Sequence, residues 1–320
     1  MKRIFYAAAA VMTLVSCGNT IGLASGEQSG DTPESRVTGT TSAETTDENS
    51  HTETTAADVQ KTTEPERERC PEPVEIDVHM PEGYQLSQSK VIEGFNTVMQ
   101  TPELPTGCEI VALTETLNFY GFGADKIEMC DTFLPVDKMA VQTMDEAYIG
   151  DPYSDDGFGC TAVCITATAN DYFDYLGSDW YAVDLTGISF QEMLYQVDQG
   201  RPAIVWSTID QRESYPQYVD VLGRNFNYWQ HCLAVYGYDL EKKQVHCADP
   251  LVGNVAYDMD RFERIYNVME RQTVILCGNE ESAGKDYTTD EEKKKWLEEN
   301  RPEESEEPEE PEEPEEVREQ

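Results

Sequence analysis

The chain has 320 residues, and its 63 acidic and 23 basic residues give a formal net charge of −40 at pH 7. This charge argues against nucleic acid as a partner and against electrostatic docking on anionic lipid, because both need clustered Lys and Arg side chains. The chain has only four histidines and no CxxC pair, so we expect no bound metal and no cofactor.

Residues 1–17 have the pattern of an export signal. Lys2 and Arg3 form a basic start, and the apolar stretch Tyr6–Val15 that follows is too short to span a bilayer. The small residues before Cys17 resemble a bacterial lipobox, in which the cysteine is lipidated and becomes the mature N-terminus. We therefore expect lipidation at Cys17, since each buried CH₂ of an acyl chain contributes about 0.8 kcal/mol to anchoring. The expected location is the extracytoplasmic face of the bacterial cell membrane.

Two further segments lack the residues that form a core. Residues 18–70 are dominated by Thr, Ser, Glu and Asp, and we expect a disordered tether there. Residues 281–320 are rich in Glu and, from residue 302 on, are interrupted by repeated proline, which predicts a disordered, solubilising acidic tail. The block 71–280 between these segments has the apolar density of one folded domain.

Helix signals come first within that block. Thr106 and Glu109 have the spacing of a capping box, and the apolar residues behind them predict a helix that ends near residue 121. A second amphipathic pattern covers residues 160–177. A third helix opens at a serine and covers residues 189–200.

The period then changes from helical to extended. Apolar and β-branched runs predict strands at Pro202–Thr208, His231–Tyr238, Gln244–Ala248 and Thr273–Cys277, with a helix at Met259–Met269 before the last strand. Helices first and strands afterwards indicate an α+β fold, with N-terminal helices packed on a C-terminal antiparallel sheet.

Cys108 is the candidate nucleophile. The capping box would place it in the first turn of its helix, where unpaired N–H groups and the helix dipole favour a thiolate and lower the thiol pKa. His231 starts an apolar strand and Asp249 ends the next one, and antiparallel pairing would bring the two side chains together. Cys, His and Asp in this chain order, helix first and strands after, form the papain-type arrangement.

Five regions resemble, in order, the C39-like peptidase family of Gram-positive bacteria. They are Gln100–Ile110 with its Thr-Gly-Cys-Glu motif, Gly150–Tyr153 with Gly157–Cys160, Pro202–Thr208, His231–Asp239 and Ala248–Gly253, and the resemblance covers residues 95–277. It implies a papain-like fold with Cys108 as nucleophile, His231 as general base and Asp249 orienting the imidazole. It also implies that the Gln100 side-chain amide and the Cys108 N–H form the oxyanion hole.

The sequence therefore predicts a membrane-anchored, extracytoplasmic cysteine peptidase that cleaves peptide bonds through a thioester on Cys108. We expect a peptide or protein substrate, membrane attachment through the N-terminal lipid, no nucleic-acid partner and a monomeric chain. Two alternatives stay open. One is a catalytically silent module that binds peptide or cell-wall material on the same fold, and the other is an amidase or transpeptidase that acts on cell-wall peptides.

Overall fold

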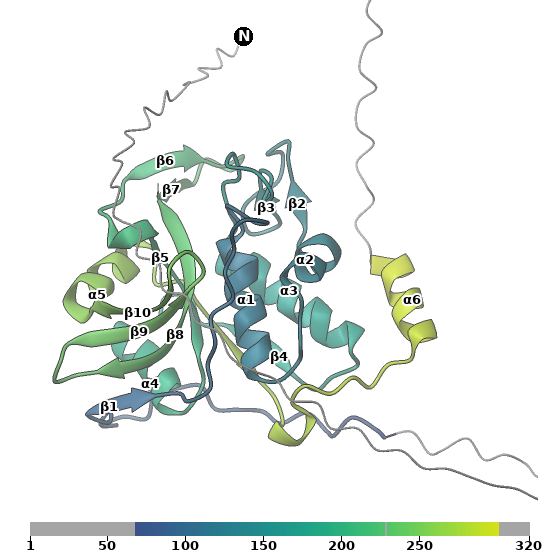
Figure 1. The fold of residues 1–320 in the computed structure, drawn as a ribbon, viewed down its shortest axis with the longest axis horizontal. Helices are drawn as coiled ribbons and strands as arrows, with labels where there is room; N and C mark the ends of the chain where they lie inside the picture. Colours follow the sequence, from purple (N-terminus) through teal and green to yellow (C-terminus); the bar gives the residue numbers. More distant parts are fainter. Residues whose placement is uncertain (1–67, 228, 301–320) are drawn as a thin grey trace, which may run out of the picture. The chain divides into compact units, whose positions relative to one another are not determined.

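The structure, a computed structural model, describes residues 68–227 and 229–300 (Figure 1). The expected signal peptide with Cys17, the tether as far as residue 67 and the acidic run after residue 300 lie outside the described residues. In the described part of the chain, no helix combines the length and the apolar character that crossing a bilayer requires.

The helices alternate with strands along the chain. In residues 68–300 the α-helices are α1 (Cys108–Phe119), α2 (Lys126–Glu128), α3 (Ala162–Tyr175), α4 (Phe190–Asp198), α5 (Met259–Val268) and α6 (Asp290–Asn300). The strands are β1 (Ser89–Val91), β2 (Val136–Asp137), β3 (Tyr148–Ile149), β4 (Tyr181–Asp184), β5 (Ala203–Thr208), β6 (Pro216–Val219), β7 (Asn225–Asn227), β8 (Gln230–Asp239), β9 (Gln244–Asp249), β10 (Gly253–Asp258) and β11 (Thr273–Cys277).

One antiparallel sheet organises the fold. Its strands run in the order β10-β9-β8-β5-β11-β4, and β1 pairs with the C-terminal end of β8. The long strand β8 lies between β5 and β9, so it connects the two halves of the sheet. The pairs β2–β3 and β6–β7 form two small sheets of their own.

The central strands are buried on both faces, and alternate residues enter two different cores. In β5, Ile204 and Trp206 pack with α1 and α3, whereas Ala203 and Val205 pack with α4 and α5. Figure 1 shows α1 and α3 on one side of β5 and β8 and α5 on the other. Because both faces of β5 are covered, its sequence is a continuous apolar run rather than an alternating one.

Each predicted helix and strand has a counterpart whose ends lie within two residues of the prediction. Ser189 caps α4 as expected, since its hydroxyl accepts from the Glu192 N–H and the Glu192 carboxylate accepts from the Ser189 N–H. The strands β4 and β10 were not predicted. β10 is an edge strand whose residues alternate between half-buried and exposed, so it has no apolar run to mark it.

The predicted capping box at Thr106 is wrong. The N-cap of α1 is Gly107, and no side chain caps this helix. The Thr106 hydroxyl instead donates to the Ser154 carbonyl at 2.9 Å. Cys108 is therefore the first residue of α1, and the Glu109 side chain is left to take other partners.

The predicted boundary at residue 280 is too early. After a short turn, α6 ends the described chain, and Trp296 packs its ring 5.7 Å from the ring centres of both Phe133 and Tyr175. Tyr287 is buried, and its N–H donates to the Leu176 carbonyl at 2.8 Å. These contacts offset the polar composition of residues 281–300, which alone predicts disorder.

Candidate active site

Cys108 lies where the start of α1 meets the start of β8. Its side chain is buried, with 5% of its surface exposed. Sγ accepts a hydrogen bond from the Cys232 N–H at 3.3 Å and donates one to Glu109 Oε2 at 3.2 Å. The peptide bond between His231 and Cys232 therefore lies beside the thiol.

The surroundings of the thiol differ from the expected ones. Burial raises the pKa of Cys108 well above its usual value, and the Glu109 carboxylate raises it further, while the Cys232 N–H opposes both effects. Among the described hydrogen bonds, none joins the thiol to the His231 ring. The prediction of a lowered Cys108 pKa is therefore wrong for this arrangement, because burial and a neighbouring carboxylate outweigh the helix start.

His231 and Asp249 are brought together as the strand order predicts. β8 and β9 pair in antiparallel register, and His231 Nε2 lies 2.7 Å from Asp249 Oδ1. Both side chains are almost fully buried. Because Nε2 faces the carboxylate, Nδ1 is the ring nitrogen that is left to take a proton from a thiol.

Asp249 is held by further hydrogen bonds. Oδ2 accepts from the Tyr257 hydroxyl at 2.6 Å and Oδ1 accepts from the Leu251 N–H at 2.9 Å. Burial alone would raise the pKa of Asp249, but the hydrogen bonds from His231, Tyr257 and Leu251 hold it below its ordinary value. An ionised Asp249 can orient the imidazole and stabilise its charged form. Sequence reasoning missed Tyr257, because β10 itself was not predicted.

Gln100 lies in the loop before α1 and is buried. Its N–H donates to the Pro250 carbonyl at 2.9 Å, which joins this loop to the turn after Asp249. The side-chain Nε2 donates to the Pro105 carbonyl at 2.6 Å, and Oε1 has no hydrogen-bond partner. The side chain is thus held by the carbonyl of Pro105, which lies three residues before Cys108, and one amide proton is still available as a donor.

Glu109 is a second polar residue at this site that sequence reasoning did not select. It is 1% exposed, although it directly follows Cys108. Its place in the Thr-Gly-Cys-Glu motif was explained by helix capping, which the structure does not support. A Glu in the otherwise apolar first turn of a buried helix was the available signal.

The loop that joins β3 to α3 packs against the loop that precedes α1 and contains Thr106. Tyr148 donates from its hydroxyl to the Thr106 carbonyl at 2.8 Å, and Thr106 in turn binds the carbonyls of this loop. A Cβ at Gly157 would lie 2.0 Å from Thr106 Oγ1 and 2.4 Å from the Tyr148 oxygen, so only glycine fits there. The loop from residue 150 to residue 160 therefore lies against the loop that precedes Cys108.

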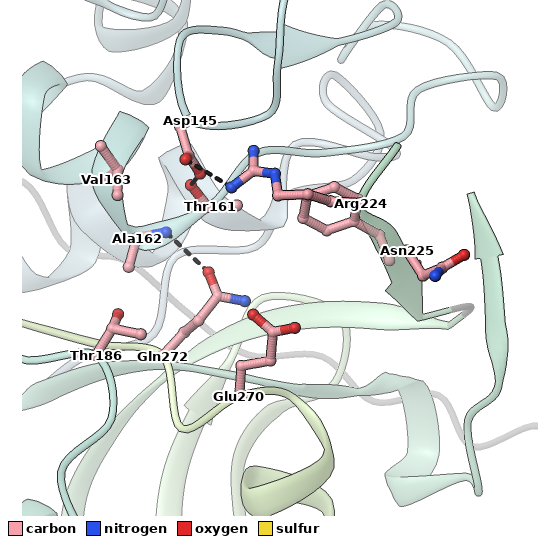
Figure 2. Close-up of a pocket in the computed structure, with 10 residues that line it drawn as sticks. Asp145, Thr161, Ala162, Val163, Thr186, Arg224, Asn225, Glu270 and Gln272 are labelled. Atoms are coloured by element: carbon pink, nitrogen blue, oxygen red, sulfur yellow. Dashed lines mark hydrogen bonds and ion pairs between the residues drawn. The ribbon is translucent and has the colours of Figure 1, made fainter. Parts of the chain in front are cut away.

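A pocket of about 160 Å³ lies between the start of α3, β7 and the turn from α5 to β11 (Figure 2). Figure 2 shows Arg224 directed at Asp145, and the Gln272 side chain accepting a hydrogen bond from the Ala162 N–H. A smaller hollow beside this pocket shares Gln272 with it and is also lined by Gln230. Neither hollow is lined by Cys108, His231 or Asp249.

A cysteine at a helix start, beside a buried His–Asp pair on neighbouring strands, is the arrangement of groups that papain-type cysteine hydrolases use. Among the described residues, no group of three His, Cys, Asp or Glu side chains is arranged to hold a metal ion. The chain belongs to the Peptidase_C39 like family, whose family model matches residues 92–274.

Three known proteins are similar to parts of this chain. The chain is 26% identical over 188 residues to the uncharacterized protein YvpB of Bacillus subtilis (strain 168). This match covers 56% of this chain and 72% of YvpB. The solved structure of a Bacillus anthracis protein, reported as a candidate C39-like peptidase, matches with a TM-score of 0.52 at 22% identity, over 60% of this chain and 98% of that one. Xylellain, a cysteine protease from Xylella fastidiosa, matches with a TM-score of 0.38 at 12% identity, over 67% and 98% of the two chains.

The fold is the predicted α+β fold of papain-like cysteine peptidases, with helices packed on an antiparallel sheet. Membership of a peptidase family implies that the substrate class is peptide or protein.

Proposed function

We propose that this chain is a membrane-anchored, extracytoplasmic cysteine peptidase with Cys108 as nucleophile, His231 as general base and Asp249 as the residue that orients the imidazole. The observation that carries the proposal is the buried hydrogen bond between His231 Nε2 and Asp249, beside a cysteine that opens a helix. The bond leaves Nδ1 to serve the thiol, which is the order of groups that nucleophilic catalysis requires.

In the first half of the reaction, Nδ1 of His231 takes the proton from Cys108, and the sulfur electron pair attacks the scissile carbonyl carbon. The negative charge that develops on the carbonyl oxygen is stabilised by the Cys108 N–H and the remaining amide proton of Gln100. The imidazolium then gives its proton to the leaving amine, and a thioester on Cys108 remains. Asp249 stabilises the imidazolium throughout this half.

In the second half, His231 accepts a proton from a water molecule, whose oxygen attacks the thioester carbonyl. The C–S bond breaks, and the proton returns to the sulfur as the carboxylic acid product leaves. The same oxyanion donors act in both halves. The loss of one such donor typically lowers the rate by about 10²–10³-fold.

The proposed membrane anchor is a lipid on Cys17, supported by the basic start, the short apolar segment and the small residues before that cysteine. The mature protein should carry an acyl mass on its N-terminal residue. Cys17→Ala should release the protein from the membrane fraction or leave it unprocessed. A mature N-terminus without acyl mass contradicts the anchor.

A catalytically silent binding module is the second candidate, and one observation favours it. The Cys108 thiol is hydrogen-bonded to Glu109 instead of His231, and burial with the Glu109 charge raises its pKa. A module that only binds peptide needs no thiolate.

The two candidates differ in a test of turnover. The full-length chain is incubated with a diverse peptide library, and new termini are mapped by mass spectrometry. The peptidase proposal expects cuts that vanish in Cys108→Ala and persist in Cys164→Ala, which alters a buried cysteine in α3. Peptide binding that is equal in wild type and Cys108→Ala, without any cut, would support the binding module.

A further inference from the structure

Both oxygens of the buried Glu109 carboxyl group are occupied. Oε2 accepts from the Cys108 thiol at 3.2 Å, and Oε1 accepts from the Cys160 N–H at 3.3 Å and from Gln230 Nε2 at 3.0 Å. The same Gln230 nitrogen lies 3.1 Å from the Cys160 carbonyl. Glu109 therefore joins α1, the loop before α3 and the first residue of β8.

The chain leaves a space of the right size for this carboxyl group. Gly159 has a φ of +124°, and a Cβ at that position would lie 2.4 Å from Glu109 Oε1 and 2.8 Å from Gln230 Nε2. Any other residue would displace the carboxyl group or the amide that holds it. The site is thus shaped around Glu109, and its other contact is the nucleophile.

Among the described residues, the hydrogen-bond partners of the Glu109 carboxyl group include no lysine or arginine. The titratable groups that face the Cys108–Glu109 pair are Tyr148 on β3, Cys160 in the loop before α3, Cys232 on β8 and Asp249 on β9. Burial raises the pKa of Glu109, and hydrogen bonds from Cys108, Gln230 and Cys160 oppose that rise. A thiolate on Cys108 would lie beside a second buried negative charge, which the low dielectric makes costly.

We propose that Glu109 is a positioning residue that holds the Cys108 thiol in a resting orientation, from which it must turn to Nδ1 of His231 before it can react. This inference rests on the proposed role of Cys108 as nucleophile. When the thiol turns, its hydrogen bond to Glu109 breaks. The proton then passes from Sγ to Nδ1 and the electron pair stays on sulfur.

The test measures how fast iodoacetamide alkylates Cys108, by peptide mass spectrometry of the folded full-length chain between pH 5 and 9. In Glu109→Gln the buried charge is lost and the side-chain volume is kept. We expect alkylation about tenfold faster at pH 7 than in wild type, with the midpoint of the rate profile at lower pH. An unchanged midpoint, or slower alkylation, overturns the proposal.

Glu115→Gln is the matched control. Glu115 lies on the same helix, is fully buried and accepts from the Val98 N–H, but does not contact Cys108. The Glu115→Gln substitution should leave the pH profile of the Cys108 alkylation rate as in wild type. An equal acceleration in both variants would mean that any buried charge on α1 has this effect, and the specific role of Glu109 would be refuted.

Two further variants complete the test. Glu109→Asp keeps the charge but shortens the side chain by one CH₂, so alkylation at pH 7 should be faster than in wild type even if Glu109→Gln fails to fold. Adding His231→Ala to Glu109→Gln or to Glu109→Asp should remove the gained reactivity. Gained reactivity that persists without the imidazole contradicts the transfer of the thiol to His231. Because alkylation needs no turnover, this test can fail or succeed independently of the peptidase proposal.

Discussion

Four buried polar side chains form two hydrogen-bonded pairs where α1 and β8 begin: Cys108 with Glu109, and His231 with Asp249. The proposed chemistry requires a third pairing, between Cys108 and His231. Sγ already accepts from the N–H of the residue that follows His231. Under the proposed resting role of Glu109, the thiol would turn to His231 by a change of the Cys108 rotamer about χ1.

Gly159 should be sensitive to substitution, because a side chain there would meet the Glu109 carboxyl group. Gly159→Ala places a methyl group against the Glu109 carboxyl group and also strains a positive φ. Gly187 has a positive φ of +99° but open space around it, so Gly187→Ala reports the backbone strain alone. Urea denaturation should show Gly159→Ala to be less stable than Gly187→Ala by at least about 1 kcal/mol. Equal losses in the two variants would show that no side chain occupies the space beside Gly159.

Asp249 should contribute stability that depends on pH. Its pKa is below the ordinary value, so its contribution is complete above the unfolded-state pKa of about 3.9 and disappears as pH falls through the folded-state pKa. At pH 5 the wild type should be more stable than Asp249→Asn by about 1–2 kcal/mol, since two of the hydrogen bonds to Asp249 come from His231 and Tyr257. At pH 2.5 the difference should be smaller than at pH 5, because protonation of Asp249 removes its contribution. A difference that stays constant between these pH values would mean that Asp249 keeps an ordinary pKa.

At the scale of elements, packing explains what the sequence could and could not predict. The strands β5, β8, β9 and β11 have apolar runs that mark them, and their antiparallel order was enough to place Asp249 beside His231. The Thr106 hydroxyl was assigned to a helix cap but donates to a carbonyl of the loop after β3, and such a tertiary contact has no local signal. Because Thr106 makes this contact instead of a capping box, the Glu109 side chain has other partners. The environment of Glu109, and with it the direction of the Cys108 pKa shift, could therefore not be predicted.

Removal of the C-terminal helix α6 tests whether the folded domain extends beyond residue 280. Lys293 lies 4.9 Å from the Tyr175 ring centre and forms an ion pair with Asp286, in addition to the Trp296 contacts. Ending the chain after residue 280 should lower the melting temperature by about 2–4 °C, which corresponds to about 1 kcal/mol in a domain of this size. Ending it after residue 300 should leave the melting temperature within about 1 °C of wild type. Equal melting of the two shortened chains would restore the prediction of a tail that does not dock.

At the scale of the whole molecule, the site depends on two cores that lie on opposite faces of one sheet. The core with α1 and α3 positions Cys108, and β8 carries His231 and also contributes to the core with α4 and α5. The arrangement of Cys108, His231 and Asp249 therefore requires the complete sheet, since Asp249 comes from β9 and its partner Tyr257 from β10. This long-range dependence is why a motif around Cys108 alone could select that cysteine but could not predict its surroundings.

The central claim is that Cys108 forms a covalent acyl intermediate with the help of His231. The most direct measurement is a stopped-flow assay of p-nitrophenolate release from p-nitrophenyl esters of N-acylated amino acids by the full-length chain. We predict a burst of about one equivalent per enzyme, followed by slower turnover. The burst should be lost in Cys108→Ala, strongly slowed in His231→Ala and kept in Cys164→Ala. A burst that survives in Cys108→Ala, or no release by the wild-type chain, would contradict the claim.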